Sequence, residues 1–160
     1  DRLRAEAIGG AGRRVAVVGA GGAARAVVRA VAGAGAADVA VINRDPGRAR
    51  LAAAMAGPVG RVARAEDLRA VDLVVQATPL GMGDDDRQPF DVQLLAPNTV
   101  VADLVYHPRV TPLLAAARAR ELPTVGGIGM LIHQAARAFE RWTGQVPDSD
   151  AMASAVPEIQ

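Results

Sequence analysis

The stretch Val15-Ala-Val-Val-Gly-Ala-Gly-Gly-Ala-Ala24 decides the fold of this chain. Its β-branched run at 15–18 favours a strand that stops at Gly19, and the alanine-rich residues 23–32 favour a helix. The turn between them fits the pattern G-x-G-x-x-A. In this context the first glycine allows a tight turn, the second lets backbone approach a pyrophosphate, and the small Ala24 lets the helix pack closely. The stretch therefore predicts the opening unit of an α/β fold.

The same alternation continues along the chain. Apolar runs separated by helix-compatible segments indicate a parallel sheet that helices cover on both faces. We predict one doubly wound, Rossmann-like α/β domain at 15–147, with an inter-domain remnant at 1–14 and a short helix and tail at 148–160. The predicted strands are 15–18, 39–42, 61–63, 73–77, 100–103 and 124–125, and the predicted helices are 23–32, 48–55, 66–69 and 112–120.

Composition narrows the class of protein. The 160 residues are 51% hydrophobic and 22% charged, which is typical of a single folded domain. The net charge is +1 and the arginines are scattered, so we expect no nucleic acid partner. No apolar run approaches the roughly 18 residues of a membrane helix, so we expect no membrane partner. The absence of cysteine favours a cytoplasmic location, and the absence of lysine excludes a catalytic lysine within the chain.

The glycine turn predicts a ligand as well as a fold. The N-terminus of the following helix would offer N–H groups and partial positive charge to phosphates. We predict dinucleotide binding there, with a purely structural turn as the alternative in a chain rich in Gly and Ala. The second strand ends in Asn43-Arg44-Asp45, and Arg48 follows. A guanidinium suits the 2′-phosphate of NADP, whereas a carboxylate would repel it, so NADP is preferred and Asp45 keeps NAD as the alternative.

Five motifs follow one another in a distinctive order. They are Gly19-Ala-Gly-Gly-Ala-Ala-Arg-Ala26, Asn43-Arg-Asp45 with Arg48-Ala49, Ala77-Thr-Pro-Leu-Gly-Met82, Asp103-Leu-Val-Tyr106 with Thr111-Pro-Leu-Leu114, and Gly127-Ile-Gly-Met-Leu-Ile-His-Gln134 with Trp142-Thr-Gly144. In this order and spacing, over residues 15–147, the chain resembles the cofactor-binding half of a shikimate dehydrogenase. The resemblance implies an NADP-dependent oxidoreductase of aromatic amino-acid biosynthesis that interconverts 3-dehydroshikimate and shikimate.

The resemblance also implies roles for individual residues. Those expected at the cofactor are Gly19, Ala20, Gly21, Gly22 and Ala23 on the pyrophosphate, Asn43, Arg44 and Arg48 on the ribose phosphate, Thr78 and Leu104 beside the cofactor, and Gly127 and Met130 near the nicotinamide. Those expected at the substrate are Tyr106 and Gln134. Met130 and Gln134 are i, i+4 neighbours, so one helix face can present a thioether and an amide together.

Two residues and one whole region depart from the family pattern. Gln76 stands where the family commonly has Asn, and Asp45 stands where many NADP-dependent members have Thr. The family's substrate domain, with a catalytic Lys and Asp, precedes the nucleotide domain. We therefore expect no catalytic residue in this chain, a missing N-terminal domain as its partner, and no activity of the chain alone. A quinate/shikimate dehydrogenase that uses NAD or NADP and a non-catalytic nucleotide-binding module are the alternatives, and a homodimer stays open.

The remaining polar and aromatic residues have simpler interpretations. We expect His107 in a loop, His133 on a surface or interface, Asp84 to Asp86 in a solvated loop, and no metal site. Asp103, at the end of a buried strand, is expected to form structural hydrogen bonds. A further helix is predicted from the apolar spacing of Ile128, Ile132, Ala135, Phe139 and Trp142. That face should be buried against the core or a partner.

Overall fold

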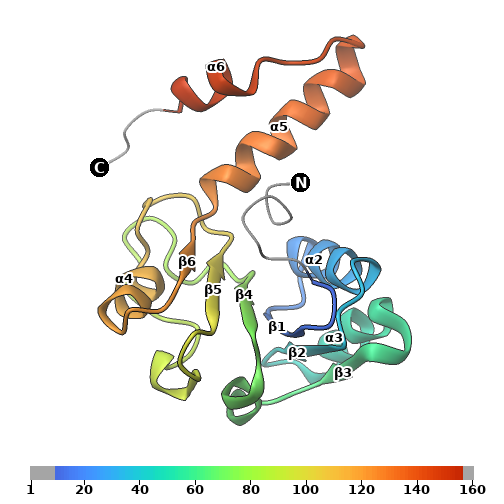
Figure 1. Cartoon of the computed structure of the whole chain (residues 1–160), viewed down its shortest axis with the longest axis vertical. Helices are drawn as coiled ribbons and strands as arrows, with labels where there is room; N and C mark the ends of the chain where they lie inside the picture. The colour runs from blue at the N-terminus through green and yellow to red at the C-terminus, as the bar shows by residue number, and fades with distance from the viewer. Residues whose placement is uncertain (1–9, 157–160) are drawn as a thin grey trace.

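The computed structural model describes residues 10–156 and contains a six-stranded parallel sheet in the order β3-β2-β1-β4-β5-β6 (Figure 1). The chain begins in the middle of the sheet, moves to one edge and then crosses to the other. The strands are β1 (Arg14–Val18), β2 (Asp38–Ile42), β3 (Gly60–Val62), β4 (Leu73–Gln76), β5 (Val100–Asp103) and β6 (Thr124–Val125). This is the doubly wound arrangement that the sequence predicts.

Helices connect the strands, and a long helix ends the described chain. The α-helices are α2 (Gly22–Gly33), α3 (Pro46–Ala53), α4 (Pro112–Ala119), α5 (Ile128–Thr143) and α6 (Ser149–Ser154). The 3-10 helices are η1 (Ala54–Val59), η2 (Ala65–Ala70) and η3 (Val92–Leu94). Each predicted strand matches the structure to within one residue at each end. The outer parts of the predicted remnant 1–14 and tail 148–160, residues 1–9 and 157–160, lie outside the described residues.

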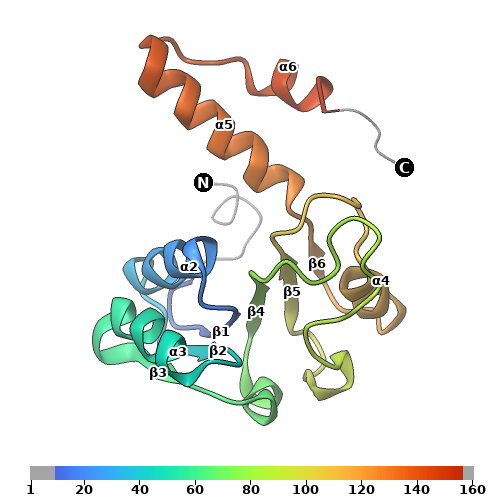
Figure 2. The ribbon, with the colours of Figure 1, turned by 180° about the vertical axis from the view of Figure 1, so that it is seen from behind.

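Both faces of the sheet are covered, which explains why its strands are apolar throughout (Figure 2). Val15 and Val17 of β1 pack toward α2, α3 and η1, whereas the alternate residues Ala16 and Val18 pack toward η2, η3 and α4. All four side chains are buried. Side chains that alternate between two buried faces give the strand its uninterrupted apolar run.

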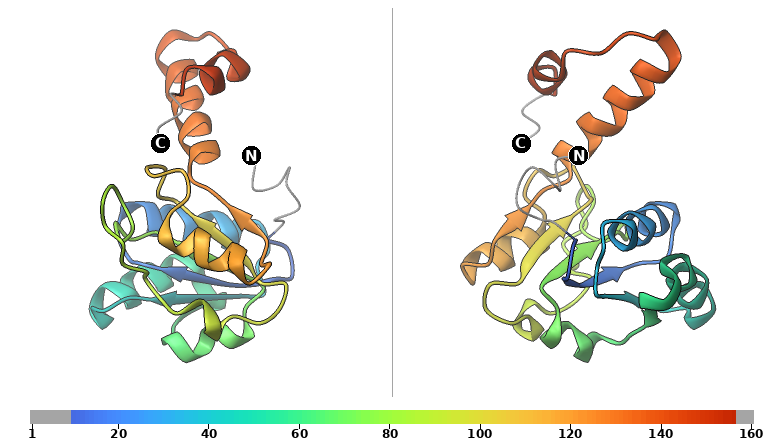
Figure 3. Two further views of the ribbon diagram at one scale, coloured as in Figure 1. Left: turned by 90° about the vertical axis from the view of Figure 1, so that its left-hand side faces the viewer. Right: turned by 45° about the vertical axis from the view of Figure 1, so that its right-hand side comes forward.

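The α5–α6 arm, residues 128–156, leaves the sheet and projects away from it (Figure 3). Ile132 is the buried residue of α5, and α6 has none. Phe139 is 40% exposed and Trp142 is 84% exposed. The helix forms as predicted; the described residues do not cover Trp142, so burial of this residue in the core of the chain is excluded and cover by a partner stays a prediction. The Asp148 carboxylate caps α6, because it accepts hydrogen bonds from the N–H groups of residues 150 and 151.

Candidate functional site

A hollow of about 280 Å³ lies at the carboxyl ends of β4 and β5. Ligands of open parallel sheets bind at this edge, near the point where the strand order reverses. The hollow takes residues from the start of α2, from the loops after β4 and β5, and from α5. Its lining consists of Ala23, Ala77, Thr78, Pro79, Met82, Leu104, Val105, Tyr106, Met130, Leu131 and Gln134. The structure therefore brings together six residues that the sequence assigned to cofactor or substrate: Ala23, Thr78, Leu104, Tyr106, Met130 and Gln134.

The glycine turn beside this hollow requires glycine at its first position. Gly19 has a φ of +115°, and a Cβ there would lie 2.9 Å from the carbonyl oxygen of Ala77. The Gly19 N–H donates to the carbonyl of Ile42 at 2.8 Å, which ties the turn to the end of β2. Ala24 is fully buried, as its predicted packing role requires. The glycine turn therefore packs between the end of β2 and the loop after β4.

Gly21, unlike Gly19, is not required by contacts within the chain. It is the N-cap residue before α2, and a Cβ added to it would meet no atom within 4 Å. No side chain caps α2 or α5, whereas side chains cap α3, α4 and α6. The first N–H groups of a helix need partners from outside it. The start of α2 therefore leaves space and backbone donors for an anionic ligand.

Two exposed cations follow the strand to which the glycine turn is hydrogen-bonded: Arg44 lies after β2, and Arg48 lies in the first turn of α3. Arg44 and Arg48 are exposed, and no residue of 10–156 forms an ion pair or hydrogen bond with either guanidinium. Asn43 donates its amide N–H to the backbone carbonyl of Asp45 at 3.0 Å. These three predicted residues lie outside the hollow. This position is expected for residues that bind the adenosine end of an extended dinucleotide, away from its nicotinamide end.

Asp45 has a local structural role. Its Oδ1 accepts hydrogen bonds from the N–H groups of Gly47 at 2.8 Å and Arg48 at 3.1 Å, so it caps α3. Thr, which the resemblance gives for many NADP-dependent members at this position, is also a favoured N-cap residue. The carboxylate is therefore explained by helix capping, and its presence alone is weak support for NAD.

Asp103 is buried at the end of β5 and forms the structural hydrogen bonds that the sequence predicts. Its Oδ1 accepts from the N–H of Val105 at 2.9 Å, and its Oδ2 accepts from the hydroxyl of Thr111 at 2.6 Å. Burial raises the pKa of the Asp103 carboxyl, and the hydrogen bonds from Thr111 and Val105 oppose that rise. Because Val105 lines the hollow, Asp103 helps to shape its wall.

Gly127 is required by packing. A Cβ at this position would lie 2.5 Å from the carbonyl oxygen of Leu104 and 2.6 Å from that of Val105. The start of α5 can therefore approach the loop after β5 only when residue 127 has no side chain. Gly127 is absent from the lining of the hollow, and Met130 three residues later is part of it.

The substrate residues predicted from the resemblance face the same space. Tyr106 is 42% exposed, and Gln134 is exposed on α5 one turn after Met130. They provide a hydroxyl and an amide at a wall that is otherwise mainly apolar. Five further lining residues were not predicted from the sequence, although all of them lie inside the motifs that carry the resemblance: Ala77, Pro79, Met82, Val105 and Leu131.

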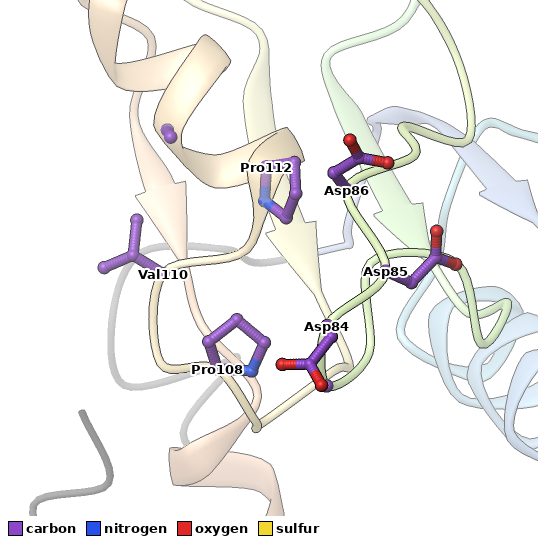
Figure 4. A pocket seen from close by; sticks show the side chains of 8 residues that line it. Asp84, Asp85, Asp86, Pro108, Val110 and Pro112 are labelled. Atoms are coloured by element: carbon purple, nitrogen blue, oxygen red, sulfur yellow. The ribbon is translucent and has the colours of Figure 1, made fainter.

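A second hollow, of about 290 Å³, lies between the loop after β4 and the start of α4 (Figure 4). Asp84, Asp85 and Asp86 line it together with Pro108 and Val110. Hydrogen bonds from Arg87 lower the pKa of Asp85 to about 2, so this carboxylate is ionised and already paired. Within residues 10–156 no cluster of three or more His, Cys, Asp or Glu side chains could hold a metal ion.

The sheet order, the glycine turn between β1 and α2, and the hollow at the carboxyl edge define a Rossmann-like nucleotide-binding domain. Two family models match the chain: that of shikimate / quinate 5-dehydrogenase over residues 4–80, and that of the shikimate 5′-dehydrogenase C-terminal domain over residues 127–156. The chain belongs to the shikimate dehydrogenase family.

Individual relatives agree with this assignment. An NADP(+) shikimate dehydrogenase of Paramagnetospirillum magneticum is 49% identical over 136 residues, which cover 82% of this chain and 49% of the relative. The structure of the Thermus thermophilus shikimate dehydrogenase with NADP(H) and shikimate has a TM-score of 0.86 at 38% identity, covering 96% of this chain and 57% of that one. The quinate dehydrogenase of Corynebacterium glutamicum with NAD gives 0.87 at 37%, covering 96% and 58%.

The chain spans about half the length of the curated relatives it matches. None of the helices described between residues 10 and 156 has the length and apolar character needed to span a membrane.

Proposed function

We propose that this chain binds NADP(H) and forms the cofactor-binding half of an enzyme that interconverts 3-dehydroshikimate and shikimate. The observation that carries the proposal is the uncapped start of α2, where Gly21 leaves open space beside the hollow. Backbone N–H groups at a helix N-terminus bind pyrophosphate well. The relatives named NADP(+) shikimate dehydrogenase support the same assignment.

The exposed arginines favour NADP over NAD. Arg44 and Arg48 offer two guanidinium groups next to the turn, and a guanidinium fits a phosphate in charge and geometry. The Asp45 carboxylate disfavours a bound 2′-phosphate only through its negative charge, because its Oδ1 already accepts the two hydrogen bonds that cap α3. A bound NADP at these groups would place its nicotinamide end toward Met130 and the hollow.

The hollow also fits a substrate that carries hydroxyl groups. Tyr106 and Gln134 can exchange hydrogen bonds with such a ligand, while Met130 and Leu104 supply apolar contact. NADPH supplies the hydride when bound. The family resemblance assigns the proton transfer to a Lys and an Asp of the substrate domain, and a positioned acid or base typically contributes about 10²–10⁴-fold. We therefore propose that this chain alone does not oxidise shikimate.

Two alternatives differ from this proposal, one in the choice of cofactor and one in catalysis. The similarity to a quinate dehydrogenase in complex with NAD, together with the carboxylate of Asp45, favours a quinate/shikimate dehydrogenase with a broader choice of cofactor. A non-catalytic nucleotide-binding module would bind NADPH but would stay inactive when mixed with a separately expressed substrate domain. Titration of the chain with NADPH and NADH side by side decides the first alternative, and the mixing experiment decides the second.

Replacement of Gly21 tests cofactor binding directly. Gly21→Val should still fold, because the backbone of Gly21 is extended and a Cβ there meets no atom within 4 Å, although Val is a poorer N-cap residue and should lower the free energy of unfolding by about 1 kcal/mol. The added isopropyl group should block a pyrophosphate and weaken NADPH binding by at least about 10-fold, as expected when hydrogen bonds to a charged group are lost. Calorimetric titration measures the affinity.

Gly33→Val is the matched control at the other end of α2, where a Cβ also meets nothing within 4 Å. This variant should bind NADPH like the wild type. Equal affinities of the Gly21→Val variant and the wild type would show that the turn is structural only.

A further inference from the structure

Gln76 is a fully buried polar side chain that no assigned role explains. It is the last residue of β4, lies opposite Asp103 in the register with β5, and is 0% exposed. Its backbone carbonyl accepts from the N–H of Leu104 at 3.0 Å. An amide buried without partners costs free energy, so the partners of this side chain show what it does.

All the hydrogen bonds of the Gln76 amide go to the turn that follows the strand. Its Oε1 accepts from the N–H of Thr78 at 2.9 Å and from the Thr78 hydroxyl at 3.0 Å. Its Nε2 donates to the carbonyls of Thr78 at 3.1 Å and Leu80 at 3.0 Å. A glutamine amide has two N–H donors and an oxygen with two lone pairs, so these four bonds use its full capacity.

The turn held in this way is a wall of the hollow. Ala77, Thr78 and Pro79 all line it. The Thr78 hydroxyl also accepts from the N–H of Leu80 at 3.2 Å, which closes the network. The Ala77 carbonyl is the atom that excludes a side chain at Gly19, so the same turn borders the glycine turn. A shift of residues 77–80 would therefore change both the hollow and its junction with α2.

We propose that Gln76 is a positioning residue that holds the turn 77–80 in the shape that receives the nicotinamide half of the cofactor. The proposal rests on the proposed function, because it concerns the same bound cofactor. Gln76 lies behind the wall and does not line the hollow. It acts by fixing the wall before the ligand arrives, which reduces the ordering cost of binding. The longer side chain at this position therefore completes the turn.

Two ligands separate this role from a general effect on folding. NADPH reaches both the hollow and the arginines at the end of β2, whereas 2′,5′-ADP carries only the adenosine half. Gln76→Met keeps the approximate volume and removes all four hydrogen bonds. We expect it to weaken NADPH binding by about tenfold, the equivalent of roughly one net hydrogen bond, and to leave 2′,5′-ADP binding within about twofold.

Two further variants complete the experiment. Gln76→Asn keeps a buried amide, so its NADPH affinity should lie between those of the wild type and the Gln76→Met variant. If the Gln76→Met variant does not fold, the comparison of Gln76→Asn with the wild type tests the proposal instead. Gln93→Met, at an exposed glutamine on η3, should match the wild type with both ligands. NADPH fluorescence reports the environment of the nicotinamide, and its enhancement on binding should fall only in the Gln76 variants.

Each result has one meaning. Selective loss of NADPH affinity with partial recovery in Gln76→Asn supports the positioning role. Equal weakening of NADPH and 2′,5′-ADP, or unchanged NADPH binding by folded Gln76 variants, would overturn it while the proposed function stands. If the wild-type chain binds neither ligand, the proposed function fails and this inference fails with it.

Discussion

The sheet body, residues 10–127, and the α5–α6 arm differ in where their apolar side chains lie. The body buries apolar residues on both faces of the sheet, as Val17 and Leu114 illustrate. The arm also has an apolar helix face, and Phe139 and Trp142 on it are exposed. A core of its own therefore stabilises the body, whereas the described residues do not cover the outer part of the arm. We expect this exposed apolar face to be an interaction surface.

The largest effect should come from the core of the body. Leu114 of α4 is fully buried, so Leu114→Ala should lower the free energy of unfolding by about 2–5 kcal/mol through lost transfer energy and the cavity left behind. Urea unfolding followed by circular dichroism measures this change. Leu51→Ala, at a leucine on α3 that is 63% exposed, is the control and should stay within about 0.5 kcal/mol of the wild type. Similar losses at both leucines would contradict the assignment of the core.

A smaller effect should come from the ion pair at the amino-terminal edge of the body. Hydrogen bonds from the Arg14 side chain and N–H lower the pKa of Asp72, and Arg14 Nη2 lies 2.8 Å from Asp72 Oδ1. Because the folded pKa lies below the unfolded value near 3.8, this stabilisation is present above that pH and is lost as the pH falls through the lowered pKa. Both side chains are more than one-third exposed, so solvent screening limits its size.

Asp72→Asn should therefore lower the free energy of unfolding by at most about 1 kcal/mol at pH 7, and the difference from the wild type should shrink toward pH 3. Urea titrations across this range give the difference at each pH. Asp84→Asn, in the exposed loop after β4, is the control. A difference that grows on acidification would reverse the predicted sign.

The smallest effect on stability should be at the tip of the arm. Trp142 is 84% exposed, so Trp142→Ala should change the free energy of unfolding by less than about 0.5 kcal/mol. Because it is the single tryptophan, its emission reports the arm directly. We expect emission typical of a solvated indole at low concentration and a blue shift as copies associate, with sedimentation to measure the association. A blue-shifted emission from a compact monomer at all concentrations would show that the arm folds onto the body.

The sequence by itself determined the order of elements and the type of sheet. The β-branched runs, the glycine turn at Gly19 and the cap at Asp148 are local signals, and each produced the expected element in the structure. The motifs also located the walls of the site, because residues 77–82 and 103–106 follow strands whose carboxyl ends must meet in a parallel sheet. The roles of these residues in cofactor and substrate binding stay predictions.

Only the tertiary structure decided how distant residues constrain one another. Gly127 needs to be glycine because α5 approaches the carbonyls of residues 104 and 105, and no periodicity along the chain reveals that approach. The amide of Gln76 is satisfied because the following turn folds back over the end of β4. Trp142 has the spacing of a core residue, yet its helix leaves the sheet. Periodicity determines which side chains share a face, whereas their cover depends on the packing of elements that are far apart along the chain.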